Sequence, residues 1–282
     1  MRRCYAVVCL IFVFFAPSQV RAEDGTAVSK DGTAISFSVY GKGEPALVFV
    51  HGWSCNRSFW KKQVPYFENK YRVVTLDLAG HGRSGRGRSV YSMKAFGEDV
   101  AAVVRKINAH KVILIGHSMG GGVIIEAAEI LPEEVMALVG IDTMHDFEKT
   151  YTPGQVEEIM KPYKDDFWKA TDSFLEKMFV KGTDPDFIDG VMEMVSDASE
   201  KVGISAMEEM LKTSYIADLP KIKAPVWCLN SELWPTRPDI NRKYVPKFYA
   251  RIMPGVGHFL MLESPDEFNR ELDDILKEIL KK

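Results

Sequence analysis

The chain has 282 residues, of which 46% are hydrophobic, and its formal net charge is −3. This length is enough to bury one large core, and α/β folds of this size are often a single domain. The near-neutral balance gives no sign of the polybasic surface with which proteins bind nucleic acid or an anionic membrane. We therefore expect a small-molecule partner and no nucleic acid. The one local basic cluster, Arg83, Arg86 and Arg88, is interpreted as a solvated loop.

The first 22 residues have the pattern of a secretory signal peptide. Arg2 and Arg3 precede an apolar run from Ala6 to Phe15, which is too short to span a bilayer comfortably. The segment VRA at 20–22 suits a cleavage site, so we predict cleavage after Ala22 and export to a periplasm or the exterior. The mature chain is then expected to have no stable membrane insertion. An uncleaved membrane anchor is the alternative.

Two of the four cysteines, Cys4 and Cys9, would leave with this segment, while Cys55 and Cys228 would remain. Export makes a disulfide between the remaining two chemically possible. Nothing in the sequence brings them together, however, and buried free thiols are the expectation.

Short apolar strands alternate with longer helical segments through most of the chain. The pattern predicts strands at 46–50, 72–78, 111–115, 135–141, 225–229 and 248–253, and helices at 91–107, 120–130 and 265–280. Such alternation is typical of a mostly parallel, doubly wound sheet that is covered on both faces. Ligands bind such sheets at the carboxyl ends of the strands, where this chain has His51, Asp77, Ser118, Asp142, Glu232 and His258.

Residues 146–219 interrupt this alternation. They contain no convincing strand and are predicted to form several helices. We interpret the segment as a helical cap inserted into a core formed by residues 23–145 and 220–282. The methionines of this segment suit either an adaptable apolar pocket wall or ordinary helix packing, and they are Met160, Met178, Met192, Met194, Met207 and Met210.

The segment GHSMG at 116–120 matches the G-x-S-x-G pattern of a nucleophile elbow. It directly follows the strand KVILI and opens the apolar segment GGVIIEAAEI, which is the strand–turn–helix setting that the motif requires. Glycine is needed on both sides of Ser118 because the turn is too tight for side chains. The start of the following helix would supply an N–H group and a positive dipole end to a developing oxyanion.

Four motifs stand in one order: HGW at 51–53, DLAGHGRS at 77–84, GHSMGG at 116–121 and GVGHFLMLESP at 255–265. With them the chain resembles the cap-bearing branch of the α/β-hydrolase family from about residue 35 to its end. The resemblance implies that Ser118 is the nucleophile and that His258 is the general base and later the acid. It also implies an oxyanion hole formed by the backbone N–H groups of Trp53 and Met119. His51, His81 and Asp77 would then have structural roles.

The third member of the triad departs from the family pattern. The family usually has an aspartate after the penultimate strand, but in the segment CLNSELWPT that position is Trp234. We favour Glu232, in the same loop, as the acid, with Asn230 and Ser231 beside it. Asp142, at the end of the preceding strand, is the alternative, and both obey the chain order nucleophile, acid, histidine. Asp146, Asp239 or no acid at all complete the possibilities.

These residues predict a serine hydrolase, esterase-like, that works through an acyl-enzyme and needs neither metal nor nucleotide cofactor. A serine nucleophile also argues against a dehalogenase or an epoxide hydrolase. Several aromatic residues favour an apolar pocket for a small or medium carboxylic ester or a lactone: Trp53, Phe59, Trp60, Phe167, Trp168 and Trp234. The alternatives are a C–C bond hydrolase with the same triad and a ligand-binding pseudo-hydrolase whose triad has degraded.

Overall fold

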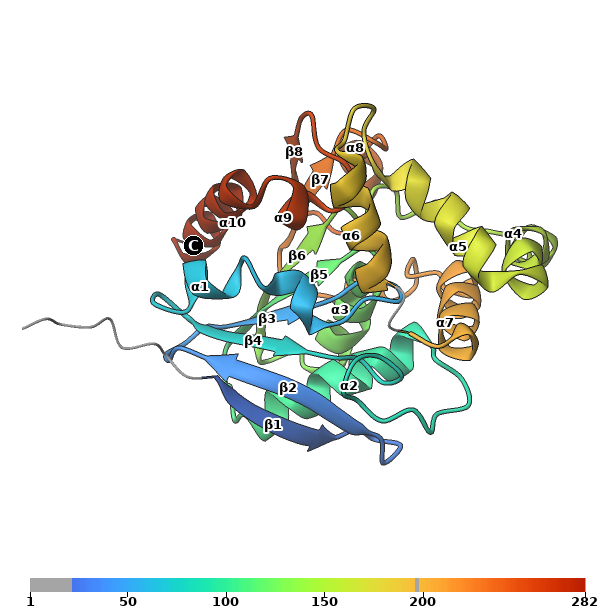
Figure 1. The fold of residues 1–282 in the computed structure, drawn as a ribbon. Helices are drawn as coiled ribbons and strands as arrows, with labels where there is room; N and C mark the ends of the chain where they lie inside the picture. Colours follow the sequence, from blue (N-terminus) through green and yellow to red (C-terminus); the bar gives the residue numbers. More distant parts are fainter. Residues whose placement is uncertain (1–21, 196–197, 282) are drawn as a thin grey trace, which may run out of the picture.

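The structure is a computed structural model that describes residues 22–195 and 198–281. The predicted signal peptide therefore lies outside the described residues except for Ala22. The described chain forms an eight-stranded sheet in the order β1-β2-β4-β3-β5-β6-β7-β8 (Figure 1). The strands are β1 (Glu23–Val28), β2 (Ala34–Tyr40), β3 (Ala46–Val50), β4 (Arg72–Leu76), β5 (Val112–His117), β6 (Val135–Ile141), β7 (Val226–Ser231) and β8 (Phe248–Met253).

The sheet is parallel from β4 through β3, β5, β6 and β7 to β8, which confirms the predicted α/β class. The edge formed by β1 and β2 is antiparallel and was not among the predicted strands. The sequence pattern that indicates β2 is the alternation of Ile35, Phe37 and Val39, which are buried on one face of the sheet. Gly32, with φ of +87°, allows the tight turn between the two strands.

Helices cover both faces of the sheet, because alternate residues of each central strand point to opposite sides. On one side, Val48 and Val74 pack with residues of α2 and α3 in one hydrophobic cluster. On the other, Phe49 and Ile113 pack with residues of α1, α9 and α10. These helices are α1 (Val64–Phe67), α2 (Met93–Lys106), α3 (Met119–Ile130), α9 (Leu260–Glu263) and α10 (Pro265–Leu280).

The chain between β6 and β7 contains only helices and turns in its described part. These are α4 (Pro153–Asp165), α5 (Phe167–Leu175), α6 (Pro185–Val195) and α7 (Glu200–Lys212), and a short α8 (Pro238–Asn241) follows β7. Figure 1 shows α4, α5 and α7 together at one side of the core and α6 across the middle of the view. The predicted architecture, a sheet with an inserted helical segment, is confirmed. Met160 and Met207 are buried in the helix packing. The domain limits at 146 and 219 stay a prediction.

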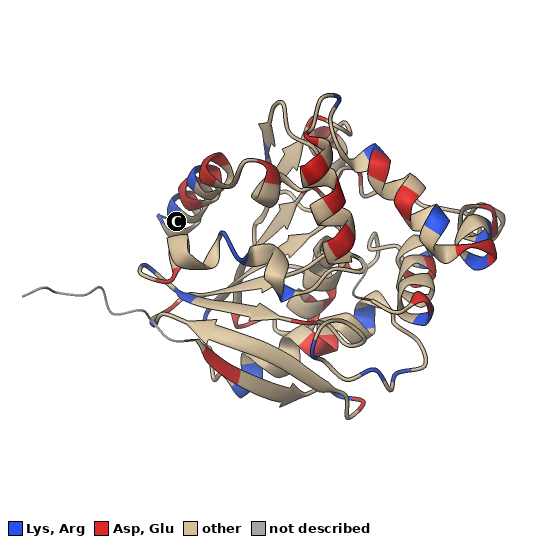
Figure 2. Cartoon of the chain, in the orientation of Figure 1, with Lys and Arg blue, Asp and Glu red and all other residues tan. Residues whose placement is uncertain are grey.

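Charged side chains of both signs are spread over the helices, with acidic residues prominent along α6 (Figure 2). Among the described residues, no helix is long and apolar enough to cross a membrane. Cys55 and Cys228 are both buried, free thiols, as expected, and burial raises the pKa of each above its usual range.

One member of the predicted basic cluster is not solvated. The guanidinium of Arg88 is almost fully buried and lies 2.7 Å from a carboxylate oxygen of Asp99 and 2.7 Å from one of Asp31. Asp99 also accepts hydrogen bonds from the hydroxyl of Ser29 and the N–H of Ala79. A buried charge needs such partners, and here they tie the β1–β2 turn to α2 and to the loop after β4. Arg83 and Arg86 are exposed as expected.

One contribution to the pH dependence of stability comes from His81, which is fully buried in the loop after β4. Its Nδ1 donates to the carbonyl of Ala79 at 3.0 Å, and burial, with His51 nearby, lowers the pKa to about 3. The unfolded chain therefore takes up a proton below about pH 6.5 that the folded chain refuses, so stability falls as the pH falls. We expect the free energy of unfolding to fall by about 1 kcal/mol between pH 6 and pH 5 because of His81.

The check is urea unfolding at pH 7, 6 and 5. His81→Gln should show a shallower loss of stability with acid than the wild type, whatever its stability at pH 7. His110→Gln, a change at an exposed histidine, should leave the pH slope unaltered. Equal slopes in all three proteins would contradict the assignment.

Candidate active site

Ser118 lies on a strained turn between β5 and α3. Its φ and ψ are 53° and −118°, a conformation that residues other than glycine rarely adopt. A Cβ on Gly116 would lie 2.3 Å from the carbonyl oxygen of Gly120, and one on Gly120 would lie 2.7 Å from that of His51. Both positions therefore require glycine, and the turn has the form expected of a nucleophile elbow.

The loop after β3 lies directly against this turn. A Cβ on Gly52 would approach the Cβ of Ser118 to 3.2 Å and Nδ1 of His117 to 2.9 Å. Trp53 follows Gly52, and Met119 is the first residue of α3, where N–H groups have no acceptor within the helix. The two residues predicted to bind an oxyanion thus follow Gly52 and Ser118, which belong to two different segments that lie against each other.

A short hydrogen bond joins His258 to Asp142. Nδ1 of His258 lies 2.6 Å from Oδ2 of Asp142, and the carboxylate is fully buried. Oδ1 accepts the N–H of Ser231 at 2.7 Å. Burial alone would raise the pKa of Asp142, but the hydrogen bond and the charge of His258 outweigh it and hold the pKa below its usual value.

The register of the sheet explains why Asp142 is so close to Ser118. His117, the last residue of β5, pairs with Ile141, the last residue of β6. Ser118 and Asp142 are therefore the next residues on two neighbouring parallel strands, and the N–H of Ser118 donates to the carbonyl of Ile141 at 2.9 Å. Asp142 itself has a φ of 46°, which turns the chain away from the sheet at that point.

The predicted preference for Glu232 does not agree with this geometry. β7 continues to Ser231, two residues farther than predicted, so Glu232 comes after the strand end and is exposed. Trp234, at the position where the family usually has its aspartate, packs edge to face with the ring of His258 at 5.4 Å. Of the other carboxylates considered, Asp146 accepts the N–H of Glu148 and Asp239 is exposed. Asp142 is the carboxylate that contacts His258.

Backbone contacts fix the loop that carries His258. The two oxygens of Glu263 accept the N–H groups of Gly257 at 2.7 Å and Phe259 at 3.0 Å, on either side of the histidine. The N–H of His258 donates to the carbonyl of Met178 at 2.7 Å. Glu263 lies within the motif at 255–265, but the sequence alone gave it no role. The feature that could have indicated this role is a carboxylate five residues after the histidine, at the end of a short helix.

His117 links the elbow to the same loop. Its Nε2 lies 2.9 Å from the carbonyl oxygen of His258, so it is the donor, and the centres of the two rings are 4.6 Å apart. Burial, with the charge of His258 second, lowers the pKa of His117 to about 3. His117 therefore stays neutral and serves as a fixed N–H donor between the segments of Ser118 and His258.

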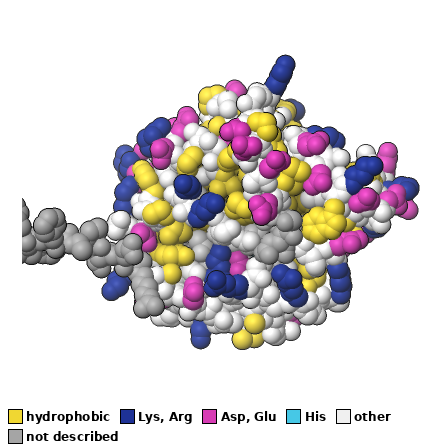
Figure 3. Space-filling view, viewed as in Figure 1, with side chains coloured by type: hydrophobic (Ala, Val, Ile, Leu, Met, Phe, Trp, Pro, Cys, Tyr) yellow, Lys and Arg dark blue, Asp and Glu magenta, His cyan; other side chains and the backbone are white. Residues whose placement is uncertain are grey.

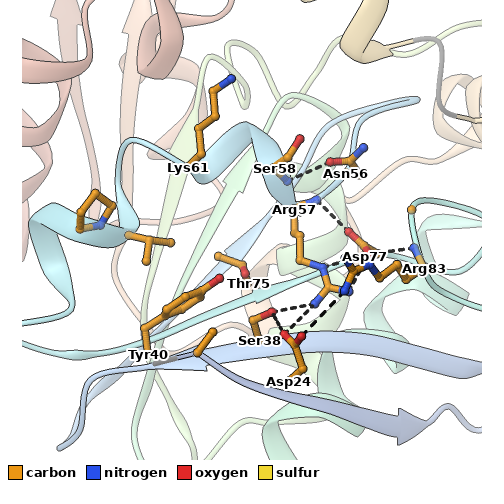
Figure 4. A pocket seen from close by; sticks show the side chains of 14 residues that line it. Asp24, Ser38, Tyr40, Asn56, Arg57, Ser58, Lys61, Thr75, Asp77 and Arg83 are labelled. Carbon is orange, nitrogen blue, oxygen red and sulfur yellow. Dashed lines mark hydrogen bonds and ion pairs between the residues drawn. The ribbon is translucent and has the colours of Figure 1, made fainter. Parts of the chain in front are cut away.

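The remaining motif residues have local partners, as expected. Asp77 accepts the N–H groups of Arg57 at 2.8 Å and Arg83 at 3.0 Å, and it also binds the guanidinium of Arg57 (Figure 4). Nε2 of His51 accepts the N–H of Leu78. The open cavity of about 720 Å³ in Figure 4 is lined by residues of the β1–β2 edge, of the segment 56–65 and of β4 with the loop after it. Neither Ser118 nor His258 lines it.

The inserted helices meet the loop after β3 through an aromatic cluster. The indole of Trp53 lies 5.9 to 6.0 Å from the rings of Tyr163, Phe167 and Phe174, and its Nε1 donates to the carbonyl of Gly203 at 2.8 Å. Of the aromatics predicted to line a pocket, Trp53 and Phe167 are buried, as are Phe59 and Trp60, whereas Trp168 is 45% exposed. Figure 3 shows hydrophobic side chains among the charges on the face that carries α6.

No group of three or more histidine, cysteine or acidic side chains in the described ranges 22–195 and 198–281 could hold a metal ion.

The clamp on the His258 loop leads to a stability prediction. Glu263→Gln replaces one accepting oxygen with an NH₂ group that faces a backbone N–H, so we expect the free energy of unfolding to fall by about 1–3 kcal/mol. Denaturant unfolding at neutral pH measures this. Glu232→Gln, the same change at an exposed position, should have an effect within about 0.5 kcal/mol. Equal stability of the two variants would contradict the clamp.

Comparison with known proteins gives three kinds of match. The model of the alpha/beta hydrolase family matches residues 47–271. A non-heme haloperoxidase of Rhodococcus erythropolis is 37% identical over 95 residues, which are 33% of this chain and 34% of the relative. A bifunctional esterase/perhydrolase of Acinetobacter calcoaceticus is 33% identical over 115 residues, which are 40% of this chain and 42% of the relative. The aligned stretches thus span less than half of these relatives.

Among solved structures, a thermophilic esterase from Thermogutta terrifontis superposes with a TM-score of 0.78 at 20% identity, covering 92% of this chain and 99% of the other. At that identity the match shows the fold alone.

Proposed function

Because the chain belongs to the α/β hydrolase family, we propose that it is a serine hydrolase that cleaves small or medium, mainly apolar carboxylic esters or lactones. The observation that carries the proposal is the 2.6 Å hydrogen bond between the buried Asp142 and His258, beside the strained turn of Ser118. A triad acid has the task of fixing the histidine tautomer and stabilising the imidazolium. Asp142 has the position and the ionisation for that task.

The proposed reaction begins with the proton of Ser118. Since Nδ1 of His258 donates to Asp142, its Nε2 is the basic nitrogen and takes this proton as the serine oxygen attacks the carbonyl carbon. The N–H groups of Trp53 and Met119 bind the resulting oxyanion. Collapse breaks the ester C–O bond, and Nε2 returns the proton to the leaving alkoxide. Water, deprotonated by the same nitrogen, then hydrolyses the acyl-enzyme and restores Ser118.

The preference for an apolar substrate rests on the cluster of Trp53, Tyr163, Phe167 and Phe174 beside the oxyanion loop. Ligand pockets are mainly lined by such apolar and aromatic side chains. The partial similarity to an esterase/perhydrolase supports an ester as the substrate. The ligand-binding alternative rested on the loss of the acid at Trp234, and Asp142 removes that premise.

We also propose that the protein is exported and cleaved after Ala22. β1 begins at Glu23, directly after this site. Cleavage there would leave every strand of the sheet intact, so the mature chain would keep its fold.

The first test uses the mature chain from Glu23, a fluorophosphonate probe and a panel of short and medium nitrophenyl esters. We expect covalent labelling and ester turnover in the wild type and neither in Ser118→Ala, because the serine oxygen forms the covalent bond. Circular dichroism of both proteins controls for folding. A folded wild type that neither labels nor turns over any ester would overturn the proposal.

A second test decides the triad acid. Asp142→Asn removes the charge that faces His258 and should lower kcat about 100-fold or more, whereas Glu232→Gln should stay within about twofold of the wild type. Both are carboxylate-to-amide changes a short distance apart, so each controls for the other. A loss in Glu232→Gln with normal turnover in Asp142→Asn would restore the prediction made from the sequence.

A further inference from the structure

A second imidazole lies against Asp142 on the side away from His258. Nε2 of His145 is 3.9 Å from Oδ1 of Asp142, whose other oxygen binds His258. The side chain of His145 is 20% exposed, and Nε2 itself is buried without a hydrogen-bond acceptor among the described residues. Asp142 is therefore the nearest negative charge to an otherwise unmatched N–H.

The neighbours of His145 determine which of its nitrogens carries the proton. The amide of Asn230 is fixed, because its oxygen accepts the N–H of Thr143 at 3.1 Å while its NH₂ group donates to the carbonyl of the same residue. That NH₂ group lies 3.2 Å from Nδ1 of His145, and the hydroxyl of Thr236 is also 3.2 Å away. The NH₂ group also donates to the hydroxyl of Thr236 at 2.9 Å, which leaves the hydroxyl proton for Nδ1. We therefore assign the proton of the neutral ring to Nε2.

Trp234 holds the two histidines apart. Its ring is 5.9 Å from that of His145 and 5.4 Å from that of His258, nearly perpendicular to each. Replacing the family's usual aspartate with this indole leaves one carboxylate, Asp142, between two imidazoles.

We propose that His145 is a positioning residue that acts through Asp142. As a neutral ring with its proton on Nε2, it directs a positive dipole end at Oδ1 and keeps the carboxylate ionised and turned towards His258. The distance of 3.9 Å is too long for a hydrogen bond, so the N–H group acts on the carboxylate of Asp142 through its electrostatic field. The effect on turnover rests on the proposed hydrolase function.

The neutral state of His145 has a physical cause. Burial lowers its pKa below the usual value, and the charges of His258 and Lys149 act in the same direction, against the charge and the backbone of Asp142. A protonated His145 would compete with the imidazolium of His258 for the one carboxylate between them. The arrangement therefore works only while His145 is uncharged.

The kinetic test compares three variants. Gln places an N–H donor where Nε2 of histidine stands and cannot be protonated, so His145→Gln should keep kcat within twofold of the wild type. His145→Phe keeps the volume and loses the donor, and its kcat should fall at least fivefold with KM changed by less than twofold. His110→Gln, an exposed change, should match the wild type. Normal kcat in His145→Phe, or an equal loss in His145→Gln, would overturn the proposal.

A second measurement is independent of turnover. Nitrogen NMR of the folded, mature Ser118→Ala protein at pH 7 should show His145 with Nε2 protonated and Nδ1 bare, together with a far-downfield proton on Nδ1 of His258. That downfield signal should persist in His145→Gln and be lost in His145→Phe. The opposite tautomer overturns the proposal. If the spectra are as expected but the wild type shows no turnover, the hydrolase function is rejected, while the proposed role of His145 in positioning Asp142 is retained.

Discussion

The hydrogen bond between Asp142 and His258 is the constraint on which the rest of the site depends. It joins residues 116 positions apart, one at the end of β6 and one beyond β8, with the inserted helices between them in the chain. The bond forms because the parallel register places Asp142 beside Ser118 at neighbouring strand ends. Glu263 and His117 then hold the backbone around His258 from two sides. A shift in either the register or that loop would break the contact.

The carboxylate that contacts His258 follows β6, so the loop after β7 has a different part in this site. β7 extends to Ser231, and the N–H of Ser231 becomes a hydrogen-bond donor to Asp142. The residues beyond it supply an indole and a hydroxyl around the carboxylate and its neighbouring histidine. The segment that usually provides the acid thus provides one backbone donor to Asp142 and side chains that pack against the neighbouring histidines. A buried carboxylate is costly unless such donors compensate its lost hydration.

Local patterns in the sequence were enough to predict the six parallel strands, the glycine-flanked turn at Ser118 and the loop that carries His258, because each depends on a short run of residues. The antiparallel strands β1 and β2 were missed. The acid could not be predicted in this way. Asp142 and Glu232 both follow sheet strands and both obey the chain order, and the choice depends on where β7 ends and on its register with β6. The burial of Arg88 was missed for a similar reason, since its partners Asp31 and Asp99 come from distant segments.

The histidines around Ser118 differ in the groups that they face. His51 and His117 are buried and hydrogen-bonded to backbone groups, and burial keeps His117 neutral. His258 differs from them in having a carboxylate at hydrogen-bond distance, so the negative charge of Asp142 faces this ring. The same carboxylate has a second imidazole beside it, and the neutrality of that ring is what leaves the negative charge of Asp142 to His258.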